Sequence, residues 1–359
     1  MSNNNSCPAK KTSIGGQALI EGIMMRGPKK TAMAVRNPEG EIVLEQWETQ
    51  TTAKAKIWKL PIIRGVFGFI DSMRFGYKCL MRSAEISGLD DLEEEAKLEK
   101  ARKKAEKSAK KRGESFDAEA FDREFKSREK KDEGSSFLTN LIMVIGVVLG
   151  VVLAMALFVI LPSYIYKWCS AVLPFLKPES AAAASLVKSV FEGILKIFLL
   201  VGYMALVSLT KDIRRTFQYH GAEHKTIFCY ERGCELTVEN VKAQGRFHPR
   251  CGTSFLILML LVSIFVSFFI DPLAIAIFGT VPATWIRILI KLLLVPIIMG
   301  VGYELIKLAG RHDNLFTRII SAPGMWLQRI TVLEPEDDMI ECAITAFKEV
   351  IPEDESDKY

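Results

Sequence analysis

The chain has 359 residues, of which 49% are hydrophobic, and its formal net charge is +5 at pH 7. So small a charge excess is no evidence for a nucleic-acid-binding protein, and an odd number of cysteines, seven, argues against a disulfide-linked secreted domain. The hydrophobic residues are gathered in a few long segments, which excludes an ordinary soluble protein and predicts a mainly α-helical polytopic membrane protein.

Residues 1–56 are expected to form a β-rich cytoplasmic segment. Two runs of β-prone residues, 31–36 and 41–48, flank an Asn-Pro-Glu-Gly turn, and this pattern predicts a hairpin in a sheet of two to four strands. The glycines among residues 15–27 lack the spacing of a phosphate-binding loop, so we interpret them as strand ends and points of close packing. Met1–Ser13 is polar and lacks the apolar core of a signal peptide.

Residues 57–88 are apolar but repeatedly interrupted by charges. This predicts a helix that lies at the membrane interface or packs in the bundle, and not a fifth crossing. Residues 89–136 follow with a dense run of alternating charges, which is typical of a solvated cytoplasmic helix or linker. The basic part, residues 97–112, is suited to contact anionic lipid headgroups or ribosomal RNA, although a charged helix in water is the simpler interpretation.

Residues 137–309 are expected to form a domain of four transmembrane helices, because a helix needs roughly 20 apolar residues to cross a hydrocarbon layer of about 30 Å. The four segments of that length are residues 137–161, 186–209, 253–279 and 285–309, the third interrupted by Asp271-Pro272. Basic residues flank the spans mainly on one side. This pattern predicts a plasma-membrane protein with both termini and the connecting loop 210–252 in the cytoplasm.

Residues 310–359 are expected to form a cytoplasmic helical segment, with a break at Pro323-Gly324. Pro335 then opens a helix with an apolar stripe, which predicts packing against other cytoplasmic parts. The stripe consists of Ile340, Ala343, Ile344, Phe347 and Ile351. The acidic residues 352–357 are expected to be disordered.

Three of the four histidines lie in the loop between the second and third spans. His220 and His224 are four residues apart, so on a helix both imidazoles project from one face and can reach one metal ion. In the order His-x-x-Glu-His, Glu223 is placed to act as a general base for hydrolysis. The pattern predicts a zinc site, and its alternative is a pair of buried histidines satisfied by hydrogen bonds.

Two later residues of the same loop, His248 and Cys251, offer further metal ligands from a single turn. With three protein ligands in all, one coordination position stays open and hydrolysis becomes possible. A rival grouping joins Cys229 and Cys234 to His248 and Cys251 in a closed, four-ligand zinc knuckle. Such a site would only hold the loop together.

Glu304 lies in the inner half of the fourth span, on the side of the histidine loop. A carboxylate at that depth is usually paired or functional, so Glu304 is a candidate ligand or a group that orients an imidazole. The alternative is a salt bridge to a neighbouring basic residue such as Lys307.

Three segments together resemble one protein family. Residues 15–27 (GGQALIEGIMMRG), 220–225 (HGAEHK) and 248–255 (HPRCGTSF) are similar to motifs of the YqhQ family of bacterial and plastid membrane proteins. The resemblance covers nearly the whole chain, except that the Lys/Glu-rich stretch from about residue 89 to residue 134 is particular to this member. It implies a membrane protein with a domain of unknown function that is described as a predicted metal-dependent enzyme.

Two functions follow from these observations. The first is a membrane-embedded zinc-dependent hydrolase that acts at the cytoplasmic face on a peptide, lipid or other hydrolysable bond. The second is a non-catalytic accessory or scaffold factor of a membrane complex, such as one for membrane-protein insertion or assembly. It is favoured by the charged arm and by polar faces within the second and fourth spans. Transport is a third function, with less support because the spans hold few ionisable residues.

Overall fold

The structure is a computed structural model that describes residues 11–49, 60–112, 116–118, 120–123, 125, 136–280, 282–312 and 314–358. It forms two compact units, one of residues 88–159 and one of the flanking parts of the chain. The predicted fold class is confirmed, because the described residues are mainly helical and include four helices long and apolar enough to cross a membrane. A four-stranded antiparallel sheet precedes them.

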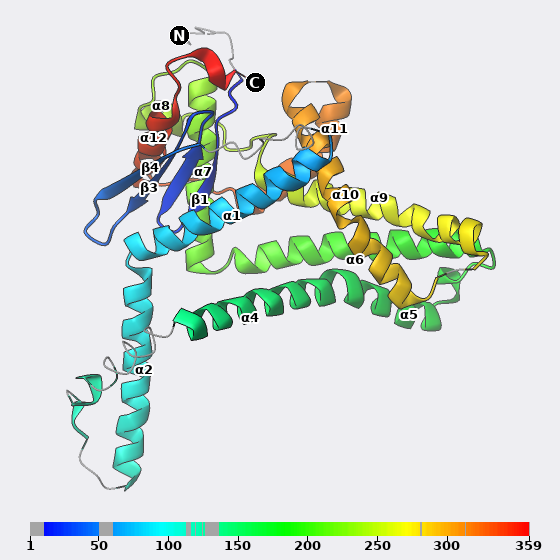
Figure 1. The fold of residues 1–359 in the computed structure, drawn as a ribbon, viewed down its shortest axis with the longest axis horizontal. Coiled ribbons are helices and arrows are strands. Elements are labelled where there is room, and N and C mark those ends of the chain that lie inside the picture. Colours follow the sequence, from blue (N-terminus) through cyan, green and yellow to red (C-terminus); the bar gives the residue numbers. More distant parts are fainter. Residues whose placement is uncertain are drawn as a thin grey trace. The chain divides into compact units, whose positions relative to one another are not determined.

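The sheet has the strand order β1 (Gly15–Leu19), β2 (Gly22–Arg26), β3 (Lys30–Arg36) and β4 (Ile42–Glu48). The predicted hairpin is confirmed as β3–β4, with Arg36 opposite Ile42. Both faces of the sheet are covered, as Figure 1 shows. Its alternating side chains enter two cores, one with α7 (Lys211–Glu231) and α12 (Asp337–Val350), the other with α1 (Ile63–Ile86).

The first candidate span, Val144–Val172, runs through α4 (Ser136–Met155), the π-turn Ala156–Ile160 and α5 (Leu161–Val172). The others lie in α6 (Ala181–Val207), α9 (Gly252–Phe278) and α10 (Thr284–Arg311). The predicted interruption at Asp271-Pro272 is wrong, since α9 continues through it. Helices α6 and α10 pack on α9, and such neighbours let a membrane helix tolerate a proline.

Helix α1 packs against α10, with Phe69 and Phe255 in ring contact at 5.5 Å between centroids. Of the two interpretations of this segment, the structure favours packing in the bundle. Helix α2 (Leu89–Arg112) forms the charged arm of the other unit. The basic residues that precede the first span in the sequence fall in residues 126–135, which lie outside the described residues.

The C-terminal segment differs from the prediction in two places. Helix α11 (Leu315–Thr331) continues through Pro323, so the predicted break is wrong; Gly324 lets it approach the side chain of Ser254 closely. The acidic end is ordered, because the Asp357 carboxylate accepts hydrogen bonds from Thr12 (2.9 Å) and from Tyr230 (2.9 Å). The apolar stripe of α12 packs into the protein core as predicted, with Ile351, just after the helix, partly buried. A short helix, α8 (Val238–Lys242), also packs against α12.

Candidate metal centre

The His-x-x-Glu-His segment lies on α7, as its spacing predicts. The imidazole rings of His220 and His224 lie side by side on one face of the helix in an edge-to-face arrangement, with centroids 4.5 Å apart. Gly221 lies between them in sequence, at a point where α7 passes the backbone of Leu333. A Cβ at Gly221 would overlap the Leu333 carbonyl oxygen, so this position requires glycine.

Cys251 completes a group of three ligand atoms with the two histidines. The ligand atoms all lie within 4.8 Å of one another, and Nε2 of His220 is 3.1 Å from the Cys251 sulfur. Zinc bonds of 2.0–2.3 Å at tetrahedral angles would place a nitrogen and a sulfur roughly 3.5 Å apart. Cys251 is the N-cap of α9 and is buried with His224, so the group lies where α7 meets the start of a membrane helix.

Both imidazoles are oriented by backbone carbonyl groups. Nδ1 of His220 lies 3.0 Å from the Thr331 oxygen, and Nδ1 of His224 lies 2.5 Å from the Arg246 oxygen. A carbonyl only accepts hydrogen bonds, so each Nδ1 carries a proton, and Nε2 is the nitrogen of each ring that can bind a metal once it is deprotonated. Metal-binding histidines are held in this way in known sites. The donor set therefore fits a zinc ion.

The two histidines also favour the thiolate form of Cys251. Burial alone would raise the pKa of the Cys251 thiol, but His220 and His224 outweigh it and hold that pKa well below its ordinary value. Burial lowers the pKa of His220, whereas Cys251 and Glu223 raise it more, to about 9. The thiolate is the form that binds metals, and the lowered pKa favours it. His220 would release its Nε2 proton when a metal binds, as metal binding to histidine requires.

Glu223 is buried beside the group but is not one of its three ligands. Its Oε1 accepts a hydrogen bond of 3.0 Å from the backbone N–H of Gly16 in β1. Burial raises the pKa of the Glu223 carboxyl, while His220, His224 and the Gly16 hydrogen bond oppose the shift. A raised pKa makes the ionised carboxylate a stronger base, which suits it to accept a proton.

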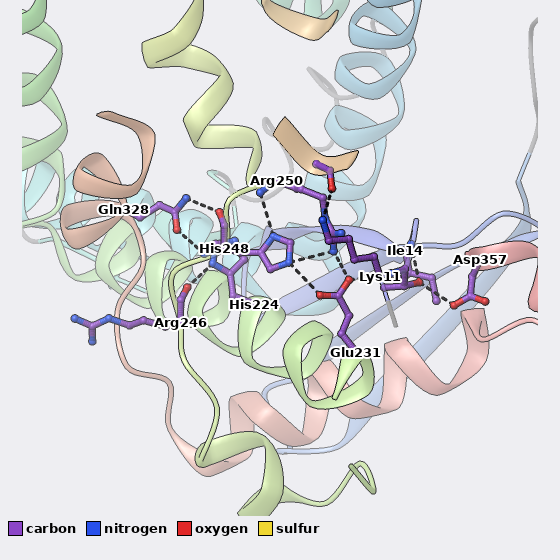
Figure 2. A network of polar contacts seen from close by, with 11 residues as sticks. Lys11, Ile14, His224, Glu231, Arg246, His248, Arg250, Gln328 and Asp357 are labelled. Carbon is purple, nitrogen blue, oxygen red and sulfur yellow. Dashed lines mark hydrogen bonds and ion pairs between the residues drawn. The ribbon is translucent and has the colours of Figure 1, made fainter. Parts of the chain in front are cut away.

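The structure does not bring His248 or Glu304 into the three-ligand group. Nε2 of His248 lies 3.8 Å from Glu231 and 3.3 Å from Arg250 (Figure 2). Its ring is tilted against the ring of Phe228, with centroids 4.7 Å apart. The Glu304 carboxylate is paired with Arg64 of α1 through two hydrogen bonds, the Nε one at 2.6 Å. The neighbouring Lys307 is not its ion-pair partner.

The rival zinc knuckle is not assembled either. The Cys229 thiol donates to the backbone oxygen of Glu235 (3.4 Å), and Cys234 is exposed. Cys251 contacts His220 and is therefore not directed at Cys229 or Cys234, the other two cysteines of that grouping.

Two cavities lie close to the centre. One of about 350 Å³ is lined by Gly16 and neighbouring residues. A Cβ on Gly16 would lie 3.0 Å from the Glu223 carboxyl carbon, so Gly16 connects the lining of this cavity to Glu223. The other, of about 490 Å³, is bordered by His248, Arg250 and Trp326. Sequence reasoning missed the role of Gly16, although the Gly15-Gly16 pair was the signal for a close backbone approach.

The pH dependence of stability can be predicted at Glu231. Burial raises the pKa of this carboxyl, but hydrogen bonds from His248, Arg250 and the Thr12 N–H together lower it below its ordinary value. The carboxylate therefore stabilises the fold above the unfolded-state pKa of about 4.3, and this contribution is lost as the pH falls further. Thermal unfolding of chelator-treated protein from about pH 6 to about pH 3 should show a steeper loss for wild type than for Glu231→Gln.

The exposed residue Glu41 provides the control. Glu41→Gln should unfold with the acid dependence of wild type. An identical acid dependence in wild type and Glu231→Gln would contradict the prediction.

Comparison with known proteins places this architecture in a family. Residues 60–353 match the family described as "Protein of unknown function (DUF1385)". The chain is 32% identical over 343 residues to "Uncharacterized protein YqhQ" of Bacillus subtilis (strain 168), covering 94% of this chain and 92% of that protein. No solved structure matches the chain. The chain therefore belongs to the DUF1385 family, to which the YqhQ motifs already pointed.

Proposed function

We propose that this protein is a zinc-dependent hydrolase held at the membrane by its four apolar helices. The observation that carries the proposal is the three-residue group His220, His224 and Cys251, in which both Nδ1 atoms are bonded to carbonyl groups and the sulfur is 3.1 Å from Nε2. Three protein ligands are typical of catalytic zinc, whereas structural zinc has four. A bound zinc ion would supply a Lewis acid with one open position.

Glu223 would act as the general base. Its raised pKa follows from burial, and the Gly16 N–H fixes one carboxylate oxygen while the other stays available to take a proton. The cavity beside Gly16 is the entrance we favour for the substrate, because Gly16 has no side chain to close it. The bond that is hydrolysed would belong to a peptide or lipid near the membrane surface.

Metal analysis of the purified full-length protein tests the site. Wild type should hold about one zinc per chain, and His224→Ala and Cys251→Ser should lose it. His248→Ala and the exposed His312→Ala are matched controls and should keep it, because neither ring lies in the ligand group. Equal zinc content in wild type and His224→Ala would refute the metal site.

Catalysis is tested separately with Glu223→Gln. This variant should keep its zinc and fail to complement a deletion strain, because the amide cannot accept the proton. Full complementation would mean that the metal is structural. If a partner then copurified in stoichiometric amount, the protein would be an accessory factor of a membrane complex.

We also propose that the centre faces the cytoplasm of a bacterial plasma membrane, since basic residues flank the spans on that side. The exposed Cys234 follows α7 and reports the orientation. A variant that keeps only this cysteine should react with a membrane-impermeant maleimide in inverted vesicles and not in intact cells. Cys169, on α5 at the opposite end of the spans, should show the reverse pattern in its own single-cysteine variant. Labelling of Cys234 in intact cells would reverse the topology.

A further inference from the structure

A cluster of charged side chains lies between α6, α9 and α10, in the half of the bundle remote from α7. Among the described residues it contains four cations and two carboxylates, all buried or nearly so. They are Lys188, Lys196, Arg287, Lys291, Glu192 and Asp271. The cluster therefore has an excess of two positive charges in a region that the apolar helices place inside the membrane.

Both carboxylates are already engaged. Asp271 accepts hydrogen bonds from Arg287 (2.6 Å) and Ser185 (2.5 Å). Glu192 accepts from Lys291 (2.9 Å) and Ser163 (2.8 Å), with the Lys188 ammonium 3.8 Å away. Glu192 cannot neutralise a further cation without giving up one of these partners. Asp271 takes both of its hydrogen bonds on Oδ2, and it is not among the charged groups that act on Lys196.

Lys196 is the cation that remains. It is only 5% exposed, and within the described part of the chain no hydrogen bond or ion pair reaches its ammonium group. The charged groups that it senses are Lys291, which repels it, and Glu192, which Lys291 already holds. In the same cluster, Arg287 Nε and Asp271 Oδ1 are buried without hydrogen-bond partners.

An ammonium group buried in a membrane helix is costly and marks a pathway or a ligand site when no protein group pairs with it. The natural counter-charge is an anion. A phosphate group carries one negative charge as a phospholipid diester and up to about two as free phosphate, so either form offsets part or all of the excess and accepts hydrogen bonds from lysine. Helices α6 and α10 both pack on α9, and the Glu192–Lys291 pair bridges them, so the cations converge on one place. Lys188 and Lys291 lie in the first halves of α6 and α10, so we infer that a phosphate would enter from the side where these helices start.

We propose that Lys196 and Lys291 form a binding site for a phosphate group, either the headgroup of an anionic phospholipid or free phosphate. The site is independent of the metal centre and goes beyond the proposed hydrolase. It accounts for the polar face of the second span without requiring transport or a partner protein.

The test uses the full-length protein in a neutral detergent, after delipidation. Thermal unfolding is followed while phosphatidylglycerol micelles, inorganic phosphate or phosphatidylcholine micelles are added. We expect phosphatidylglycerol or phosphate to raise the Tm of wild type, and the probe that does so identifies the source. Phosphatidylcholine, whose headgroup has no net charge, should have no effect. The proposal is overturned if no probe raises the Tm.

Lys196→Met removes the unpaired charge and should weaken the apparent affinity at least tenfold, whereas Lys196→Arg should retain it. The exposed Lys167 of α5 provides the matched control, and Lys167→Met should bind like wild type. Equal binding by wild type and Lys196→Met would also overturn the proposal. If Lys196→Met does not fold, phosphorus analysis of native wild-type protein decides: less than one phosphate-bearing lipid or phosphate per chain refutes the site.

Discussion

Gly221→Ala is expected to destabilise the protein severely, although alanine is the better helix former. In an exposed helix this change stabilises by about 1 kcal/mol. Here the new methyl group overlaps the Leu333 carbonyl oxygen, which belongs to backbone and cannot rotate away. Leu333 is also held to α7 because its N–H donates to the Phe217 oxygen (2.9 Å). Overpacking typically costs about 1–3 kcal/mol, and we expect the upper end of this range or more.

The matched control is Gly68→Ala, at another helical glycine with nothing within 4 Å of the added Cβ. It should leave the Tm unchanged or raise it slightly. Thermal unfolding in detergent, followed by circular dichroism, measures both variants, and a Gly221→Ala protein as stable as Gly68→Ala would disprove the predicted clash.

Gln328→Leu should produce the second large effect. The Gln328 side chain is fully buried, accepts from the His248 N–H (2.8 Å), and donates to the His248 carbonyl (2.8 Å) and to Ser254 (2.9 Å). Leucine has a similar volume but leaves the His248 N–H without a partner, and it removes one of the donors to the His248 carbonyl and the donor to Ser254. Each buried unsatisfied group costs about 1–3 kcal/mol, so we expect a loss of about 3 kcal/mol.

Zinc binding should weaken together with stability, because the Cys251 N–H donates to the same His248 carbonyl (3.3 Å) and the turn positions the thiolate. Gln218→Leu is the control, since Gln218 makes one exposed hydrogen bond of 3.2 Å to Glu334. Chemical denaturation and zinc titration measure the two effects, and a Gln328→Leu protein that matches Gln218→Leu in both would contradict the assigned role.

Local periodicity accounts for what the sequence predicts correctly. The four spans, the β3–β4 hairpin, the buried stripe of α12 and the placement of His220 and His224 on one helical face all depend on residues a few positions apart. The errors occur where distant packing decides. Proline normally ends a helix, yet α11 continues through Pro323 in contact with α9 and α10.

The partners of the site residues show the same limit. From the sequence, Glu304 is a candidate ligand or, as the alternative, the partner of a neighbouring basic residue such as Lys307. In the structure α1 instead brings Arg64 from 240 positions away. The glycine pair signals a close approach, but the sequence does not identify Glu223 as the group that Gly16 holds, or the Thr331 carbonyl as the group that orients His220. Each contact depends on how whole elements pack. Residue types were enough to identify the candidate ligands, whereas the groups that orient them through hydrogen bonds could be identified only from the fold.

The long separations within the centre have a consequence for biosynthesis. His220 is oriented by a carbonyl that lies 111 residues later in the chain, and Thr12 meets Asp357 across 345 residues. A ribosome that has just completed the ligand Cys251 has still to make the last two spans and the helices that close the site. Contacts between distant residues form late in folding. Metal incorporation would therefore be a post-translational event, and a nascent chain halted before α11 would expose its cysteine and histidines in an unfinished pocket.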